Sequence, residues 1–406
     1  MKNEELNTFI TKFYTYKLFS IMGFILPFVA VMFDKNGLSA TQIALCMMAA
    51  KAIQFITEIP SGVIADKYSR RNVLIASQLF VVIAYTFWLF MPYFCGYLLG
   101  YICFGLGISL DSGCNEAFLF DKLKQYEKRS LYERVRGRSN ALVSAGIMIG
   151  SLVASYLFKQ GFDFGILIIG TIATTLVSIV ILSSIKSAKN FKDSGEVKHI
   201  LSYIQILKKG ISYSYKHTTI AKLLLFAAFS SFANIGFAEY GEIFYNELTN
   251  NLAIVALIYS ANKAMTIIGN LIGEFFKKVS IRFLVLIYLV VGCLDTVAFV
   301  LYKFPISIFI ILSSTVIIYA AIVNVSAKIN DLIPSKIRAT VLSVKGFIHS
   351  LGAFIFLFSF GIVVDSYGSY RIGFITFSVV SAIVTFVFLV ILWKDQHLRK
   401  REKRLR

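Results

Sequence analysis

Twelve stretches of mostly apolar residues follow one another along this chain, and each is long enough to cross a lipid bilayer. An α-helix rises about 1.5 Å per residue, so about 20 residues span the hydrocarbon core. Most of the connections between the stretches are short and polar, which requires consecutive helices to run antiparallel. The predicted spans are residues 9–33, 41–63, 72–92, 94–118, 139–158, 164–185, 219–241, 252–275, 281–302, 305–328, 339–364 and 372–393. The sequence therefore predicts an all-α membrane protein with twelve transmembrane helices.

The composition excludes an ordinary soluble domain. Of the 406 residues, 57% are hydrophobic and 16% are charged, and the mean hydropathy is +0.73. The five cysteines lie in or beside apolar stretches and lack the paired spacing of a disulfide framework or a zinc site. No glycine-rich phosphate loop follows a predicted strand. We therefore expect no metal, no cofactor and no enzymatic activity.

The positive charge is distributed unevenly across the membrane. The loops on one side hold only Lys35, Lys159, Lys303 and Arg371, whereas most of the 41 Lys and Arg residues lie in the termini and the loops of the other side. Such an excess marks the cytoplasmic side, so we expect both termini in the cytoplasm and the chain in the cell membrane. The net charge of +19 then reflects orientation and attraction to an anionic inner leaflet, and we expect no nucleic-acid partner.

One long polar gap divides the predicted helices into two groups of six. We expect an N-terminal six-helix bundle at 1–186, a cytoplasmic linker at 187–218, a C-terminal six-helix bundle at 219–393 and a basic tail at 394–406. In the linker, Ile200, Ile204, Leu207 and Ile211 recur at helical spacing. This pattern predicts either an amphipathic helix along the membrane surface or a solvated linker.

Between the second and third spans lies the motif EIPSGVIADKYSRR, residues 58–71. A short turn within it carries one acid and three cations, which belong at a membrane surface. The stretch resembles the loop between helices 2 and 3 of the major facilitator superfamily, and it departs from that pattern at Ser69, where the family usually has glycine. The matching residues are Gly62, Asp66, Lys67, Arg70 and Arg71.

The resemblance to the superfamily extends along nearly the whole chain. After the eighth span, Asn270, Glu274, Lys277 and Lys278 weakly repeat the spacing of the first motif. Residues 112–124 and 333–343 resemble one bacterial branch whose members are often classed as drug exporters. The resemblance implies two pseudo-symmetric six-helix bundles around a central path, working by alternating access.

Charged side chains inside predicted spans are costly, so each needs a partner, water or a function. Five ionisable groups, Lys17, Glu58, Asp111, Lys345 and His349, fall in the cytoplasmic third of the predicted bilayer. Counting residues from the helix ends places the first four about 9–12 Å deep. The resemblance implies that helices 1, 4, 7 and 10 line the path, and that helices 2 and 11 meet across the two bundles.

We expect the proton-coupling groups among the acids Glu58, Asp111 and Glu116. Burial favours a protonated carboxyl and a nearby lysine favours a charged one, so a change between these environments would couple protons to transport. The alternative is that Lys17–Asp111 and Glu58–Lys345 are static ion pairs that fasten helices.

The other candidates are assigned by position. The resemblance implies that Asp66 closes the cytoplasmic gate against the start of helix 11, near residues 339–342, where unpaired N–H groups favour an anion. Lys67, Arg70 and Arg71 would then pair with Glu116 or Asp121.

Within the spans, Lys51 shares a helix face with Glu58, and Asn115 shares one with Asp111. Lys263 either binds an anionic substrate group or neutralises Glu239 or Glu242. Asp295 lies in helix 9, which the resemblance implies is peripheral, so we expect either a structural role or a mispredicted position for it. Gly146 and Gly150 have the GxxxG spacing of close helix contact.

The sequence thus predicts a secondary active transporter, acting as a monomer on a small-molecule substrate and protons. Our first interpretation is proton-driven export of a small amphipathic or drug-like compound. The alternatives are proton-coupled uptake or flipping of an anionic or lipid-like substrate, favoured by the intramembrane lysines, and a sensor or scaffold that no longer transports. The sequence does not identify the substrate.

Overall fold

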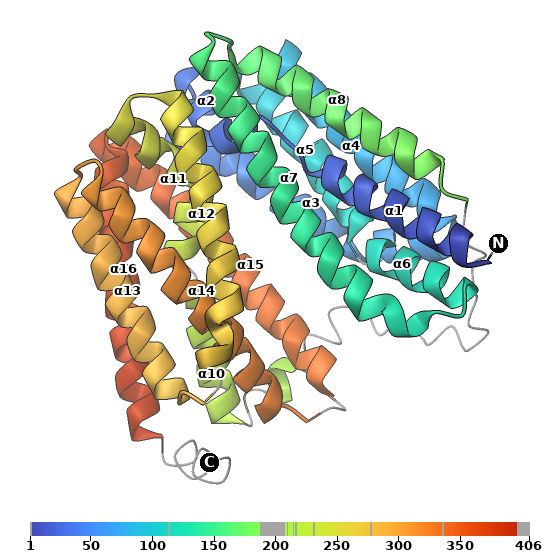
Figure 1. The fold of residues 1–406 in the computed structure, drawn as a ribbon. Coiled ribbons are helices and arrows are strands. Elements are labelled where there is room, and N and C mark those ends of the chain that lie inside the picture. Colours follow the sequence, from blue (N-terminus) through green and yellow to red (C-terminus); the bar gives the residue numbers. More distant parts are fainter. Residues whose placement is uncertain are drawn as a thin grey trace. The chain divides into compact units, whose positions relative to one another are not determined.

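The computed structural model describes residues 2–112, 114–186, 208, 210–213, 215, 217–229, 232–276, 278–334 and 337–395. Some helical residues within these ranges have undescribed side chains, namely 2–3, 58–67, 219, 227–229, 232–236, 274, 326, 329–330, 332, 338–339 and 342–343. The described residues form helices and connections and contain no strand (Figure 1). The predicted amphipathic helix of the linker and the tail beyond residue 395 lie almost wholly outside the described part.

The chain divides into two compact units. The first holds Met1–Gly195 and Asn251–Lys263, and the second holds Glu196–Asn250 and Ala264–Arg406. The main division falls inside the predicted linker, while the detailed boundaries of the four predicted segments stay predictions. Helices of the first unit are α1 (Lys2–Ser20), α2 (Val29–Lys35), α3 (Ala40–Lys67), α4 (Arg70–Phe90), α5 (Phe94–Asp111), α6 (Cys114–Gln125), α7 (Tyr132–Lys159) and α8 (Phe164–Ser183), with 3₁₀ turns at Leu26–Phe28 and Arg129–Leu131.

The second unit has the same helical character. Its helices are α10 (Thr218–Phe229), α11 (Phe232–Thr249), the last part of α12 (Leu252–Ile272, which belongs to the first unit as far as Lys263), α13 (Ile281–Leu301), α14 (Ile306–Leu332), α15 (Arg338–Tyr367) and α16 (Tyr370–Lys394). Helix α13 packs against α14 and α16. A buried core that includes Leu223, Phe226, Leu284 and Tyr288 holds these elements together.

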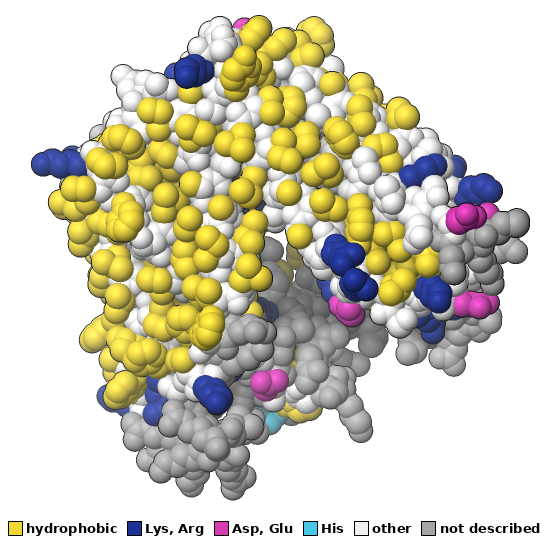
Figure 2. Space-filling view, in the orientation of Figure 1, with side chains coloured by type: hydrophobic (Ala, Val, Ile, Leu, Met, Phe, Trp, Pro, Cys, Tyr) yellow, Lys and Arg dark blue, Asp and Glu magenta, His cyan; other side chains and the backbone are white. Residues whose placement is uncertain are grey.

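Within the described residues, ten helices are long and apolar enough to cross a membrane. They include the spans predicted at 41–63, 72–92 and 372–393, observed as α3, α4 and α16. The predicted seventh span corresponds to two shorter helices, α10 and α11. Many large apolar side chains on these helices face outward, among them Ile56, Val180 and Phe309, and hydrophobic side chains are spread widely over the described part of the face seen in Figure 2. This surface suits contact with lipid.

The first predicted span, 9–33, is not one continuous helix. Helix α1 ends at Ser20, residues 21–25 are irregular, and a 3₁₀ turn then leads into α2. The hydroxyl Oγ1 of Thr171 in α8 accepts hydrogen bonds from the backbone N–H groups of Phe24 (2.9 Å) and Ile25 (3.3 Å). Because irregular backbone inside a membrane must be satisfied by protein, Thr171 makes this break possible.

The fourth predicted span, 94–118, is also interrupted. Helix α5 ends at Asp111, Ser112 leaves the helical conformation with ψ 124°, and α6 begins at Cys114. A third correction concerns residues 58–71, where the sequence predicted a turn carrying Asp66 and Lys67. Helix α3 continues to Lys67, so the turn before Arg70 is only two residues long.

Close packing in the first unit brings α1 against both α7 and α8 (Figure 1). A Cβ atom placed on Gly146 would lie 2.7 Å from the carbonyl oxygen of Leu18, and one on Gly150 would lie 3.1 Å from that of Gly23. The GxxxG prediction of close helix contact is therefore confirmed, and the contact is made with the broken first span.

Candidate functional site

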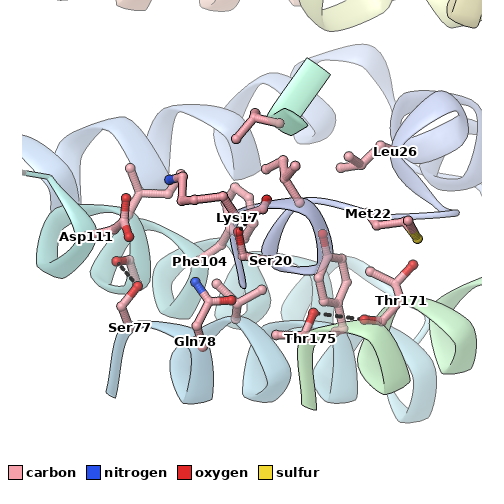
Figure 3. Close-up of a pocket in the computed structure, with 17 residues that line it drawn as sticks. Lys17, Ser20, Met22, Leu26, Ser77, Gln78, Phe104, Asp111, Thr171 and Thr175 are labelled. Atoms are coloured by element: carbon pink, nitrogen blue, oxygen red, sulfur yellow. Dashed lines mark hydrogen bonds between the residues drawn. The ribbon is translucent and has the colours of Figure 1, made fainter. Parts of the chain in front are cut away.

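Two pockets of the first unit meet at the same two charged side chains. The inner pocket has a volume of about 170 Å³, and its wall includes Lys17, Ser20, Gln78, Asp111, Thr171 and Thr175 (Figure 3). The outer pocket has a volume of about 270 Å³, and its wall includes Lys17, Asp111, Asn115, Glu116, Arg136 and Asn140. Lys17 and Asp111 line both pockets and form the candidate site.

Asp111 owes its position to the interruption between α5 and α6. It is the last residue of α5, and α6 begins three residues later at Cys114. Its Oδ1 accepts hydrogen bonds from Asn115 Nδ2 (2.9 Å) and from Tyr16 Oη (3.4 Å), and Asn115 Nδ2 also lies 3.4 Å from Tyr16 Oη. Tyr16 is 0% exposed and Asn115 is 7% exposed. These contacts fix one carboxylate oxygen, while Oδ2 accepts no hydrogen bond from any described residue.

Lys17 approaches the same site from the last turn of α1. The helix dipole favours a cation at this position, whereas an anion at the C-terminus of α5 is disfavoured unless donors or a cation compensate it. The Lys17 side chain extends toward Asp111 in Figure 3, and its Nζ lies 5.9 Å from the centre of the Tyr16 ring. Both residues are described, yet they do not form an ion pair. The static ion pair predicted between Lys17 and Asp111 is therefore not observed, and the two residues instead line the same pockets.

The opposite wall of the inner pocket consists of neutral polar groups from α4 and α8. Gln78 is 6% exposed, and its Oε1 accepts a hydrogen bond from Ser178 Oγ (3.3 Å). Its amide nitrogen points into the pocket in Figure 3 and donates to no described residue. Ser77 Oγ donates to the carbonyl of Gly107 (2.8 Å), which ties α4 to α5. The sequence reasoning missed Gln78 because an uncharged residue in a span gives no signal of cost.

Glu116, a predicted proton-coupling group, lies in the outer pocket and is paired with Arg136 of α7. Both side chains are substantially exposed, at 55% for Glu116 and 42% for Arg136. Exposed ion pairs of this kind contribute about 0–1 kcal/mol to stability. Because Glu116 is exposed to solvent and paired with Arg136, its environment is less suited than that of Asp111 to a carboxyl group that changes its protonation state during transport. The coupling role of Glu116 stays a prediction.

The basic motif is described only in part. Arg70 forms an ion pair with Asp121 of α6 at 2.7 Å, which confirms one of the pairings predicted for it. Arg71 donates to the carbonyl of Ile185 at 3.2 Å. The side chains of Glu58, Gly62, Asp66 and Lys67 lie outside the described part, so the gating role predicted for this motif stays a prediction.

The remaining described candidates line neither pocket. Lys263 Nζ lies 4.7 Å from the centre of the Tyr259 ring on its own helix. Lys51 lies half-buried on α3, and Lys345 and His349 lie on α15 in the second unit. Among the described residues, no group of His, Cys, Asp and Glu has a metal-binding arrangement.

Comparison with known proteins identifies the fold. A family model described as the Major Facilitator Superfamily matches residues 13–356, which is most of the chain. The chain belongs to the major facilitator superfamily. The resemblance inferred from the motif at residues 58–71 is therefore confirmed. This protein is a multi-pass membrane protein, and its family points to a transporter rather than an enzyme.

Individual relatives are distant. An uncharacterized MFS-type transporter, YxaM, of Bacillus subtilis (strain 168) is 21% identical over 228 residues, and this alignment covers 56% of each chain. The chain thus spans about half the length of the curated relative that it matches.

Solved structures cover more of the chain. The nucleoside transporter NupG has a TM-score of 0.78 at 14% identity, with 96% of this chain and 99% of that chain covered. The D-xylose-proton symporter has a TM-score of 0.65 at 12% identity, with coverages of 95% and 97%. A bacterial homolog of the human lysosomal transporter Spinster has a TM-score of 0.69 at 15% identity, with coverages of 96% and 95%. At these identities the likeness establishes the fold.

Proposed function

We propose that this transporter exchanges protons for a small solute at Asp111, and that proton entry drives export of the solute by alternating access. The observation that carries the proposal is the set of contacts that this carboxylate makes. Asp111 lines both pockets, holds one oxygen against Tyr16 and Asn115, and forms no ion pair with Lys17, which is also described.

A carboxylate of this kind supports exchange because it binds only one positively charged partner at a time. A proton and a cationic group of the solute would compete for the free oxygen of Asp111. Occupation by one partner then lowers the apparent affinity for the other, which is a negative coupling between two ligands. The competition produces countertransport if the protein rarely changes between its inward-open and outward-open states while the site is empty. One partner then leaves on the side where the other enters.

The volumes of the two pockets limit the size of the solute that the site can bind. Drug-sized ligands occupy pockets of about 300–1,000 Å³, whereas the inner pocket measures about 170 Å³ and the outer pocket about 270 Å³. Within the first unit, therefore, the geometry favours a small polar solute over a bulky amphipathic drug.

Proton-coupled uptake is the second candidate, and Lys17 is the observation that favours it. If an anionic group of the solute bound Lys17 while Asp111 held the proton, both ligands would occupy the site together. Simultaneous binding gives cotransport instead of exchange. The D-xylose-proton symporter among the structural neighbours shows that the same fold is found in a proton symporter.

Proton flux in reconstituted vesicles tests the proposal. The purified protein is placed in vesicles that contain a pH-sensitive dye, and solutes are added under an imposed pH gradient. Exchange predicts that proton movement and solute movement have opposite directions, and that Asp111→Asn abolishes the solute-dependent proton flux. Glu133→Gln is a matched control, because Glu133 is an exposed acid that lines neither pocket.

Flux of protons and solute in the same direction would support uptake and contradict exchange. Flux without dependence on Asp111 would contradict the assignment of the coupling group. A folded protein that moves no proton with any member of a broad solute panel would favour the non-transporting interpretation.

A further inference from the structure

The inner pocket contains one cation and one anion in its wall. All of its lining residues are described, and the charged side chains among them are those of Lys17 and Asp111. The other polar members are hydroxyls and the amide of Gln78. With both side chains charged, the wall is neutral overall but carries two separated charges, and these two residues do not form an ion pair.

Each of these charged groups retains capacity for a ligand. Lys17 Nζ makes no hydrogen bond to a described residue and lies 5.9 Å from the centre of the Tyr16 ring. Asp111 keeps Oδ2 available, since both of its hydrogen bonds end on Oδ1. The Gln78 amide nitrogen, from a side chain 6% exposed, adds a donor on the facing wall. Two donors and one anionic acceptor therefore face one cavity.

We infer that the inner pocket binds a small zwitterion, with its carboxylate on Lys17 and Gln78 and its ammonium group on Asp111. This inference rests on the proposed transport function and names the substrate class of the same site. A zwitterion compensates both wall charges and brings no net charge into the membrane interior. A cation alone would leave Lys17 uncompensated, and an anion alone would leave Asp111 uncompensated, at a high cost in a site of low dielectric constant.

The rest of the wall indicates what the zwitterion carries. Met22, Leu26, Val81, Phe104 and Ile108 form an apolar surface next to the polar groups. An apolar protein cavity of about 150 Å³ accommodates a benzene molecule, so a cavity of about 170 Å³ suits a ligand of on the order of eight non-hydrogen atoms. The combination fits an amino acid with a short aliphatic side chain.

Binding to the purified full-length protein tests this inference without requiring transport. The probe is L-leucine, compared with L-leucinamide and isopentylamine, which lack the carboxylate, and with 4-methylpentanoate, which lacks the ammonium group. Affinity is measured by calorimetry and by ligand-dependent thermal stabilisation. We expect L-leucine to bind about tenfold or more tightly than each singly charged analogue, because charge-assisted hydrogen bonds at both ends are the strong ones.

Two variants locate the binding groups. Lys17→Gln should lower the affinity for L-leucine and remove most of its preference over L-leucinamide, while the affinity for L-leucinamide should not fall, because a bound cation no longer leaves Lys17 uncompensated. Gln78→Leu should reduce the affinity for L-leucine by a smaller factor, about threefold to tenfold, consistent with a single hydrogen bond. Lys17→Arg keeps the charge and should retain the preference for the zwitterion, which provides a second readout if Lys17→Gln folds poorly.

Equal affinities for L-leucine and L-leucinamide would overturn the inference, as would undetectable binding of L-leucine or an unchanged preference in folded Lys17→Gln. The outcomes separate this inference from the proposed exchange. Zwitterion binding together with proton flux that does not depend on Asp111 would contradict exchange alone. Proton exchange with a solute that carries no carboxylate would contradict the zwitterion alone.

Discussion

Asn115 donates a hydrogen bond of 2.9 Å to Asp111, and this bond crosses the interruption between α5 and α6. The two residues are four apart in sequence, as neighbours on one helical face are, although they belong to different helices. The interruption leaves the carboxylate open to the pockets, and Asn115 limits its movement. A flexible carboxylate would lose more conformational freedom each time it bound a ligand.

Replacing Tyr16 with phenylalanine should weaken solute binding. The substitution removes the hydroxyl that donates to Asp111 over 3.4 Å while preserving the buried ring. Hydrogen bonds to charged groups contribute about 1.5–3 kcal/mol, and this bond is long, so we expect a loss of affinity of about threefold to tenfold. Tyr14→Phe is the matched control on the same helix, since Tyr14 lines neither pocket. Equal effects of the two substitutions on calorimetric affinity would contradict the role assigned to Tyr16.

The Arg70–Asp121 ion pair should contribute more to stability than the Glu116–Arg136 pair in the same unit. Arg70 and Asp121 are mostly buried, with exposed side-chain fractions of 22% and 9%, so removal of one partner leaves a poorly solvated charge. We expect Asp121→Asn to lower the free energy of unfolding by roughly 2–4 kcal/mol. The exposed pair should give less than about 1 kcal/mol for Glu116→Gln.

Thermal unfolding in detergent compares the two substitutions. A double-mutant cycle with Arg70→Gln isolates the pair from other contacts of Asp121. A negligible coupling energy between positions 70 and 121 would show that the pair does not fasten α4 to α6.

How far the sequence reveals this site depends on the kind of residue. Lys17 and Asp111 were identifiable because a charge in a predicted span is costly and therefore conspicuous. Tyr16 and Gln78 were not, since helical periodicity does not show which polar residue faces a cavity. Hydropathy located spans such as those observed as α3, α4 and α16, yet it could not reveal the break at residues 21–25. The local sequence there is apolar, and the group that satisfies the broken backbone, Thr171, lies 147 residues from Phe24.

Thr171→Val tests whether that hydroxyl permits the break. Valine has nearly the same shape but cannot accept the hydrogen bonds from the N–H groups of Phe24 and Ile25. Leaving a buried donor unsatisfied costs about 1–3 kcal/mol, so we expect a loss of that order in the free energy of unfolding, together with weaker solute binding. Thr175→Val is the control for stability alone, because Thr175 also lines the inner pocket, while its hydroxyl donates to the Thr171 carbonyl of its own helix. A smaller loss for Thr171→Val than for Thr175→Val would contradict this account.

Glycine substitutions in α7 should have opposite effects at two positions of the same helix. Apart from its chain neighbours and the adjacent backbone of its own helix, Gly137 has no atom within 4 Å of an added Cβ. Alanine is favoured over glycine within a helix by about 1 kcal/mol. Gly137→Ala should therefore be neutral or stabilising. At Gly146 the added Cβ would approach the backbone oxygen of Leu18 to 2.7 Å, so α1 must move. Overpacking of this kind costs about 1–3 kcal/mol.

The displacement caused by Gly146→Ala has a specific consequence for function. Leu18 follows Lys17 directly, so movement of this part of α1 shifts the ammonium group relative to Asp111. We expect Gly146→Ala to reduce both the unfolding temperature and the solute affinity, whereas Gly137→Ala should reduce neither of them. Thermal unfolding and calorimetry on the same preparations measure the two effects together. A stable Gly146→Ala protein with unchanged affinity would show that contact between α7 and α1 does not position the site.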